Sequence, residues 1–124
     1  MNRRKILLIE DNFTTLDIYK KTLEREGLRT ISVTFGEEAL FAAKAGKPDL
    51  ILLDLLLPGS TSGLEALKEI KNEKGLSKIP VVVITNLHTE EKIAKQLGAV
   101  DYLVKTNTSL TEVVATVKKR LQIN

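Results

Sequence analysis

Cysteine is absent from this sequence of 124 residues. Its absence excludes a disulfide framework and a thiolate metal site, and nothing else in the composition points to an oxidising compartment. The first residues are basic like the start of a signal peptide, but only a short apolar run, residues 6–9, follows before Glu10 and Asp11. No apolar run approaches the roughly 20 residues that a membrane-spanning helix needs. We therefore expect a cytoplasmic protein with no membrane association.

A nucleic-acid-binding surface has little support either, because aromatic residues make up only 4% of the chain and the net charge is only +3. Such a surface would need a basic stripe with stacking aromatic side chains, or a known reader motif. The basic residues instead gather partly near the two ends, at 3–5 and 118–120, where solvated side chains are the simplest explanation. We therefore expect no direct binding to nucleic acid.

The composition is that of a folded domain. Hydrophobic residues make up 43% and charged residues 28% of the chain, a balance typical of globular rather than disordered proteins. The length matches one ordinary domain. No linker, internal repeat or low-complexity stretch divides the chain. The sequence therefore predicts one domain over residues 1–124, with no output domain.

Five segments have the patterns of β-strands. Three apolar runs, at 6–9, 50–53 and 81–84, lack polar alternation, as is typical of strands covered on both faces of a parallel sheet. Residues 29–34 alternate polar and apolar side chains, which favours an edge strand, and residues 99–104 offer a fifth strand.

Helical patterns separate these strands. Apolar residues recur at helical spacing before Gly27 and before Gly75, and each glycine indicates a helix end. Helices are also expected over 36–45 and 89–98, where acidic residues fall in the first turn. A capping-box sequence at 109–112 begins a last helix. Its expected apolar face consists of Leu110, Val113, Val114, Val117 and Leu121. The alternation predicts an α/β fold with a doubly wound, five-stranded parallel sheet.

Polar side chains follow the predicted strands where each strand ends. These residues are Glu10 and Asp11 after the first strand, Asp54 after the third, Thr85 after the fourth and Lys105 after the fifth. Open parallel sheets bind ligands beyond the carboxyl ends of their strands. Each residue alone could be a helix cap or a solvated side chain. Their concentration at one edge is not required by core packing and predicts a functional site.

The residue types at this edge suit metal-assisted phosphoryl transfer. Like charges about 4 Å apart repel by roughly 4 kcal/mol at an effective dielectric near 20, so crowded carboxylates need a cation. Mg²⁺ fits, because it prefers oxygen ligands and binds through one or two carboxylates together with water and phosphate oxygens. With a metal ion and Lys105 nearby, a carboxylate oxygen can attack phosphorus and form an acyl phosphate.

These motifs resemble the response-regulator receiver domains (CheY-like) of two-component signalling, and the resemblance runs from Arg4 to Leu121. Residues 6–12 are similar to the first strand and acidic pair of the family, and residues 53–58 to its phosphoacceptor segment. Residues 84–85 resemble the segment with the switch hydroxyl, and residues 102–105 that with the switch aromatic and the lysine. The resemblance implies a flavodoxin-like (βα)5 fold with strand order 2-1-3-4-5.

The resemblance also implies a role for each residue. Asp54 would accept a phosphoryl group from a sensor histidine kinase or a histidine phosphotransfer protein, and Lys105 would pair with the phosphoryl oxygens. Thr85 and Tyr102 would form the switch. The implied Mg²⁺ ligands are Asp11 and Asp54 directly, Glu10 through water, and the backbone carbonyl of Leu56. The implied function is that of a phosphoacceptor switch that catalyses its own phosphorylation and dephosphorylation. The surface of helix 4, strand 5 and helix 5 would bind an unidentified target protein.

The sequence departs from the family pattern at three places beside the switch. Thr106 stands where the family usually has proline, and a non-proline cis peptide costs about 3 kcal/mol, so we expect no cis bond there. Asn86 stands where a small residue is common and is expected to crowd the space that Tyr102 would enter. The loop at 58–63 is one residue longer than the common form.

Three other functions fit the sequence less well. A binding module that ignores phosphorylation usually lacks the acidic pair, the acceptor or the lysine, all of which are present here. Metal-dependent phosphohydrolases with an aspartate nucleophile place a second acid two residues later, where this chain has Leu56. A flavin or nucleotide site would suffer repulsion between phosphate and the acidic pair Glu10 and Asp11. The lone histidine, His88, is expected to be structural or exposed.

Overall fold

A five-stranded parallel sheet forms the centre of the protein. The computed structural model describes residues 3–124. The sheet contains β1 (Lys5–Ile9), β2 (Arg29–Val33), β3 (Leu50–Leu53), β4 (Val81–Thr85) and β5 (Asp101–Val104). The strand order is β2-β1-β3-β4-β5, which confirms the predicted flavodoxin-like arrangement and places β3 in the middle of the sheet.

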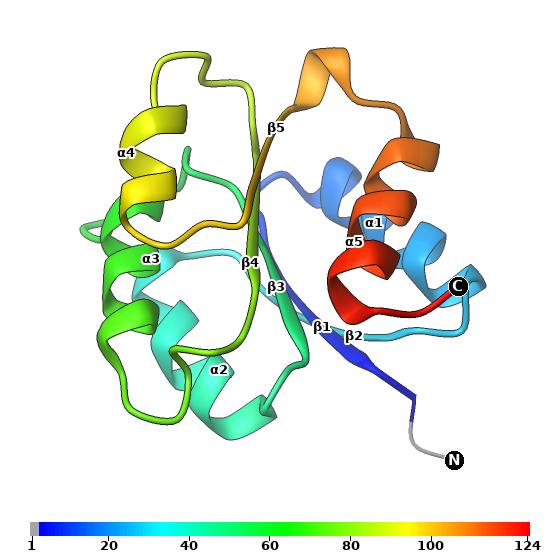
Figure 1. The fold of residues 1–124 in the computed structure, drawn as a ribbon. Helices are drawn as coiled ribbons and strands as arrows, with labels where there is room; N and C mark the ends of the chain where they lie inside the picture. The colour runs from blue at the N-terminus through cyan, green and yellow to red at the C-terminus, as the bar shows by residue number, and fades with distance from the viewer. Residues whose placement is uncertain (1–2) are drawn as a thin grey trace.

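Helices cover both faces of the sheet (Figure 1). On one face lie α1 (Phe13–Arg25) and α5 (Leu110–Leu121), and on the other α2 (Ala39–Gly46), α3 (Gly63–Asn72) and α4 (Glu91–Gln96). Successive side chains of a strand point to opposite faces. Leu7 and Ile9 of β1 therefore enter the core beneath α2, α3 and α4, whereas Ile6 and Leu8 enter the core beneath α1 and α5. This double burial explains why the central strands lack polar alternation.

The ends of the longer helices follow the sequence signals. Ser109 and Glu112 form the expected capping box at the start of α5, with both reciprocal hydrogen bonds present. Ser62 and Glu65 form a second capping box at the start of α3. Gly27 follows α1 with a φ angle of 84°, a left-handed conformation that costs glycine little. No helix in the described part of the chain is long and apolar enough to cross a membrane.

Three predicted elements differ from the structure in extent. The helix expected over 36–45 begins as a 3-10 turn, η1 (Gly36–Glu38), and α-helical winding starts only at Ala39. The helix expected over 89–98 is reduced to α4, and β5 starts at Asp101 rather than at residue 99. Gly36 lies against the backbone of Thr61, whose carbonyl oxygen leaves no room for a Cβ atom at this position.

The apolar face predicted for α5 is only partly correct. Val113, Val117 and Leu121 are buried against the sheet, as expected. Leu110 is 42% exposed. Leu110 and Val114 line a surface groove together with Thr22 and Arg25 of α1 and with Glu26, so these two side chains of α5 face α1. The predicted face is therefore correct for Val113, Val117 and Leu121 but not for Leu110 and Val114.

Candidate functional site

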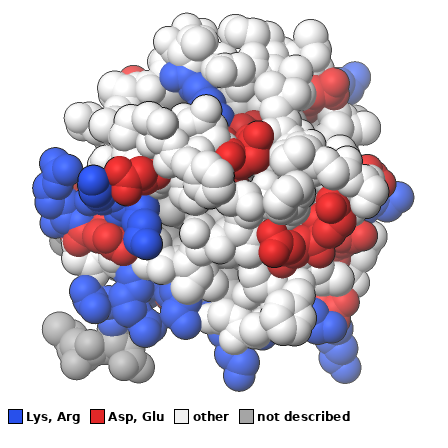
Figure 2. Space-filling view, turned by 180° about the vertical axis from the view of Figure 1, so that it is seen from behind, with Lys and Arg blue, Asp and Glu red and all other residues white. Residues whose placement is uncertain are grey.

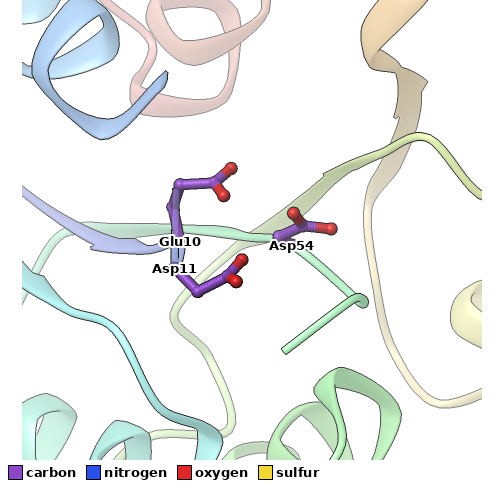
Figure 3. Close-up of side chains that lie close together, drawn as sticks. All are labelled: Glu10, Asp11 and Asp54. Carbon is purple, nitrogen blue, oxygen red and sulfur yellow. The ribbon is translucent and has the colours of Figure 1, made fainter. Parts of the chain in front are cut away.

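Three carboxylates converge at the carboxyl edge of the sheet (Figure 3). Glu10 and Asp11 follow β1, and Asp54 follows β3, its backbone N–H donating to the carbonyl of Ile9 at 2.9 Å. Carboxylate oxygens of all three residues lie within 4.8 Å of one another. Glu10 and Asp54 are each only 3% exposed, whereas Asp11 is exposed to solvent. The parallel pairing of β1 and β3 thus creates the acidic cluster that the sequence predicted.

Lys105 places its ammonium group between two of these carboxylates. Its Nζ lies 2.6 Å from Oε1 of Glu10 and 2.7 Å from Oδ2 of Asp54, and its side chain is 16% exposed. The remaining oxygens are also hydrogen bonded: Glu10 Oε2 accepts from the Asn12 N–H, and Asp54 Oδ1 accepts from the Leu56 N–H, each at 3.0 Å. Both buried carboxylates are therefore held in fixed positions.

The pKa values at the site reflect a competition between burial and charge. Burial raises the pKa of Glu10, and the charge of Asp54 adds to this rise, while hydrogen bonds from Lys105 and Asn12 oppose it. Burial acts to lower the pKa of Lys105, but hydrogen bonds to Asp54 and Glu10 outweigh burial and hold this pKa above its ordinary value. Lys105 therefore remains an ammonium ion at neutral pH and partly neutralises the cluster.

The cluster has the chemistry of a magnesium site. All its side-chain donors are carboxylate oxygens, which hard divalent cations prefer. Oxygens bound to one octahedral Mg²⁺ at about 2.1 Å lie roughly 3 to 4 Å apart, so the carboxylates need only a small adjustment to share an ion. Asp11 is exposed, and its carboxylate points toward that of Asp54 (Figure 3). The residues present fit Mg²⁺ or Mn²⁺.

The two predicted switch residues meet at the backbone of Leu87. Thr85 is fully buried at the end of β4, and the N–H of Leu87 approaches its hydroxyl oxygen at 3.4 Å. Tyr102 on β5 donates its hydroxyl to the Leu87 carbonyl at 2.5 Å. Burial raises the pKa of Tyr102. A movement of the Leu87 backbone would therefore change the hydrogen-bond contacts of both Thr85 and Tyr102.

Two backbone groups at the site were missed by the sequence reasoning. The N–H of Asn12 holds Glu10, and the side chain of Asn12 caps α1 by accepting from the Thr15 N–H at 2.9 Å. Asparagine three residues before threonine at a helix start is a readable capping signal. The carbonyl of Leu87 had no signal in the sequence, because any residue supplies the same backbone atom.

The departures from the family pattern are local. No peptide bond within residues 3–124 is cis, in agreement with the expectation drawn from Thr106. Asn86 is exposed, while Tyr102 is half-buried and hydrogen bonded, so Asn86 does not crowd Tyr102 in this conformation. His88 is exposed. The N–H of Thr61, in the longer loop after Pro58, donates to Glu37 at 2.9 Å.

Comparison with known proteins places this geometry in a family. The family model for the response regulator receiver domain matches residues 6–118. The alkaline phosphatase synthesis transcriptional regulatory protein PhoP of Bacillus subtilis is 35% identical over 119 residues, which cover 96% of this chain and 49% of PhoP. The polar-differentiation response regulator DivK of Brucella ovis is 33% identical over 120 residues, which cover 95% of this chain and 96% of DivK. This chain therefore spans about half the length of the first relative and nearly all of the second.

A solved structure also has the same fold. The receiver domain of the sensor histidine kinase PA1611 from Pseudomonas aeruginosa, with a magnesium ion coordinated in its active site cleft, matches with a TM-score of 0.87. It is 27% identical, and the match covers 98% of this chain and 99% of that one. The family match over residues 6–118 includes the acidic cluster, Thr85, Tyr102 and Lys105. The chain therefore belongs to the response-regulator receiver family of two-component signalling.

Proposed function

We propose that Asp54 accepts a phosphoryl group and that the domain changes its binding surface in response. The observation that carries this proposal is the central position of Asp54. The strand order puts Glu10 and Asp11 on one side of Asp54, and Thr85 and Lys105 on the other. A phosphoryl group on Asp54 would thus lie between a metal-binding side and a hydrogen-bonding side. Glu10 also contacts Lys105, but β1 does not pair with β4, so only Asp54 follows a strand that neighbours the strand of Thr85.

The proposed reaction is a direct transfer between two side chains. A carboxylate oxygen of Asp54 attacks phosphorus, and the bond from phosphorus to the imidazole nitrogen of the donor's phosphohistidine breaks. The electron pair of that bond returns to the imidazole, and Asp54 becomes an acyl phosphate. A bound Mg²⁺ would supply positive charge for the phosphoryl oxygens. The domain itself thereby catalyses its phosphorylation, and hydrolysis of the acyl phosphate resets it.

Lys105 and the Leu87 backbone would carry the response. Lys105 already contacts Asp54 at 2.7 Å, so its ammonium group is placed to exchange carboxylate oxygens for phosphoryl oxygens. Thr85 would turn its hydroxyl toward the phosphoryl group and move the N–H of Leu87 with it. Since the Tyr102 hydroxyl is hydrogen bonded to the Leu87 carbonyl, β5 would move as well. The surface formed by α4, β5 and α5 is therefore the proposed binding site for the downstream target.

The proposed donor is a sensor histidine kinase or a histidine phosphotransfer protein, and the proposed location is the cytoplasm. Both follow from the family rather than from any single contact in this structure. A phosphorylated donor protein mixed with the chain and Mg²⁺ would test the first proposal. Transfer of label to the wild-type chain but not to Asp54→Asn is the expected result.

Magnesium is expected to stabilise the folded state, because it relieves repulsion among carboxylates that lie together only after folding. A ligand at about ten times its dissociation constant adds about 1.4 kcal/mol, which raises the melting temperature of a domain of this size by roughly 5 °C. Thermal melts with and without Mg²⁺ measure this shift. Asp11→Ala and Asp54→Ala are expected to reduce it. If Mg²⁺ raised the melting temperature of both variants as much as that of the wild type, the ion would bind elsewhere.

The phosphorylated form is expected to be long-lived for its family, because Leu56 and Leu87 border the proposed entry path of the hydrolytic water. Leucine neither donates nor accepts a hydrogen bond, so it cannot orient an attacking water. Leu56→Asn and Leu87→Glu are expected to accelerate phosphoryl loss roughly tenfold, below the roughly 100-fold of a fully positioned general base. Intact mass followed over time measures the loss.

Leu110→Asn serves as the matched control for Leu56→Asn. Leu110 is 42% exposed and Leu56 50% exposed, but Leu110 lies on α5. The control is expected to lose phosphate at the wild-type rate. If the polar variants at 56 and 87 also do so, these leucines do not control access of water.

A further inference from the structure

The most exposed aromatic side chains of the described chain include one on α2 that the phosphorylation site does not use. Phe41 is 76% exposed, whereas Ala39 and Ala43 of the same helix are fully buried against the sheet. Together with Leu40 and Ala45, Phe41 lines a groove of about 670 Å³ between α2 and α3. Large aromatic residues in such positions are typical centres of protein interfaces, because their burial removes much apolar surface from water.

The exposed face of α2 carries opposite charges on either side of Phe41. Glu38 and Glu37 lie three and four residues before Phe41, and Lys44 and Ala45 lie three and four residues after it. Within α2 this spacing puts Lys44 and Ala45 on the face of Phe41, and the exposed Glu37 and Glu38 of η1 precede that face. Figure 2 shows a group of acidic side chains in its right half, where α2 and α3 lie, and basic side chains at the lower edge of the same half. The face therefore runs from an acidic end through an aromatic centre to a basic end.

This face is held in place by the loop before α3. Oε1 of Glu37 accepts the Thr61 N–H at 2.9 Å, and Gly36 packs directly on the Thr61 backbone. Lys44 lies 3.3 Å from Glu73, but both side chains are substantially exposed, so this pair is weak and easily exchanged. Glu38 is exposed at the opposite end. Glu38 and Lys44 are therefore accessible to an approaching molecule.

We propose that this face of α2 is a two-fold contact between two copies of the chain, centred on Phe41. Two such helices packed antiparallel place Phe41 against its counterpart. The acidic end of each copy, Glu37 and Glu38, then lies beside Lys44 of the other copy. A two-fold interface must be complementary to itself, which this ordering of charges satisfies. A partner that carried only one sign of charge would attract only the acidic or only the basic end of this face. Ala45 is small and permits close approach of the two backbones.

Sedimentation of the full chain from about 5 to 500 µM tests the contact. The wild type is expected to show a monomer–dimer equilibrium, and Phe41→Asp is expected to remain monomeric throughout. Phe13→Asp is the matched control, because Phe13 is also 76% exposed but lies on α1. It is expected to dimerise like the wild type. A monomeric wild type, or a dimer that survives Phe41→Asp, would refute the contact and leave the face to another partner.

Charge reversal tests the two-fold geometry without touching the aromatic centre. Glu38→Lys and Lys44→Glu are each expected to weaken self-association roughly tenfold, because each places two like-charged pairs across the interface. Mixing the two variants restores opposite charges at both pairs, so the mixed dimer is expected to form at least as well as the wild-type dimer. Failure of the mixture to associate better than either variant alone would exclude this arrangement, and thermal melts check that each variant is folded.

Discussion

Asp54→Asn is expected to abolish covalent phosphorylation of the domain. The amide that replaces the carboxylate is a poor nucleophile toward phosphorus. Glu10 also contacts Lys105, but it follows β1, which does not pair with β4, the strand that carries Thr85. Incubation with acetyl phosphate and Mg²⁺ followed by intact-mass analysis should show one added phosphoryl group in the wild type and none in the variant. The structure should tolerate the change, since asparagine retains the shape and the acceptor oxygen for the Leu56 N–H.

Asp11→Asn provides the control for a general loss of site charge. Asp11 is exposed and belongs to the proposed metal-binding side, so its loss is expected to slow phosphorylation without eliminating the adduct. A phosphoryl adduct that persists in Asp54→Asn would show that another residue is the acceptor. If the adduct were lost in both variants, intact mass would not show which of Asp54 and Asp11 is the acceptor. Peptide mapping of the wild-type adduct then identifies the modified residue.

Most of the fold could be predicted because strand burial determines the hydrophobic pattern. The runs at 6–9, 50–53 and 81–84 lack polar residues since both faces of their strands are covered, and all three became central strands. The residues that end these strands then had to meet at one edge of the sheet. For this reason the hydrophobic pattern alone predicts that Glu10 and Asp54 lie together.

The details of the site could not be predicted, because they depend on side-chain torsions and backbone atoms. The sequence placed Lys105 at the correct edge, but it did not show that the ammonium group bridges Glu10 and Asp54. The sequence also gave no sign that the Tyr102 hydroxyl is hydrogen bonded to the Leu87 carbonyl. Helix ends without strong caps were similarly imprecise: α4 has no side-chain cap and proved shorter than expected.

Lys105→Met is expected to destabilise the metal-free protein by about 3 to 5 kcal/mol, the usual cost of removing one partner from a buried ion pair. Methionine preserves much of the aliphatic side chain, so the main loss is the ammonium group between Glu10 and Asp54, each of whose side chains is only 4% exposed. Urea denaturation with a chelator present measures the change. Adding Asp54→Asn to this variant should recover part of the stability, because one uncompensated carboxylate is removed.

Lys118→Met is the matched control, because Lys118 also pairs with a glutamate at 2.6 Å, but the side chains of Lys118 and Glu26 are 25% and 37% exposed. Its loss is expected to cost no more than about 1 kcal/mol. Mg²⁺ should stabilise Lys105→Met more than the wild type, since in the variant the ion is the main positive charge near two buried carboxylates. If the two lysine variants lose equal stability, or if Mg²⁺ stabilises Lys105→Met no more than the wild type, then Lys105 and the metal ion do not neutralise the same carboxylates.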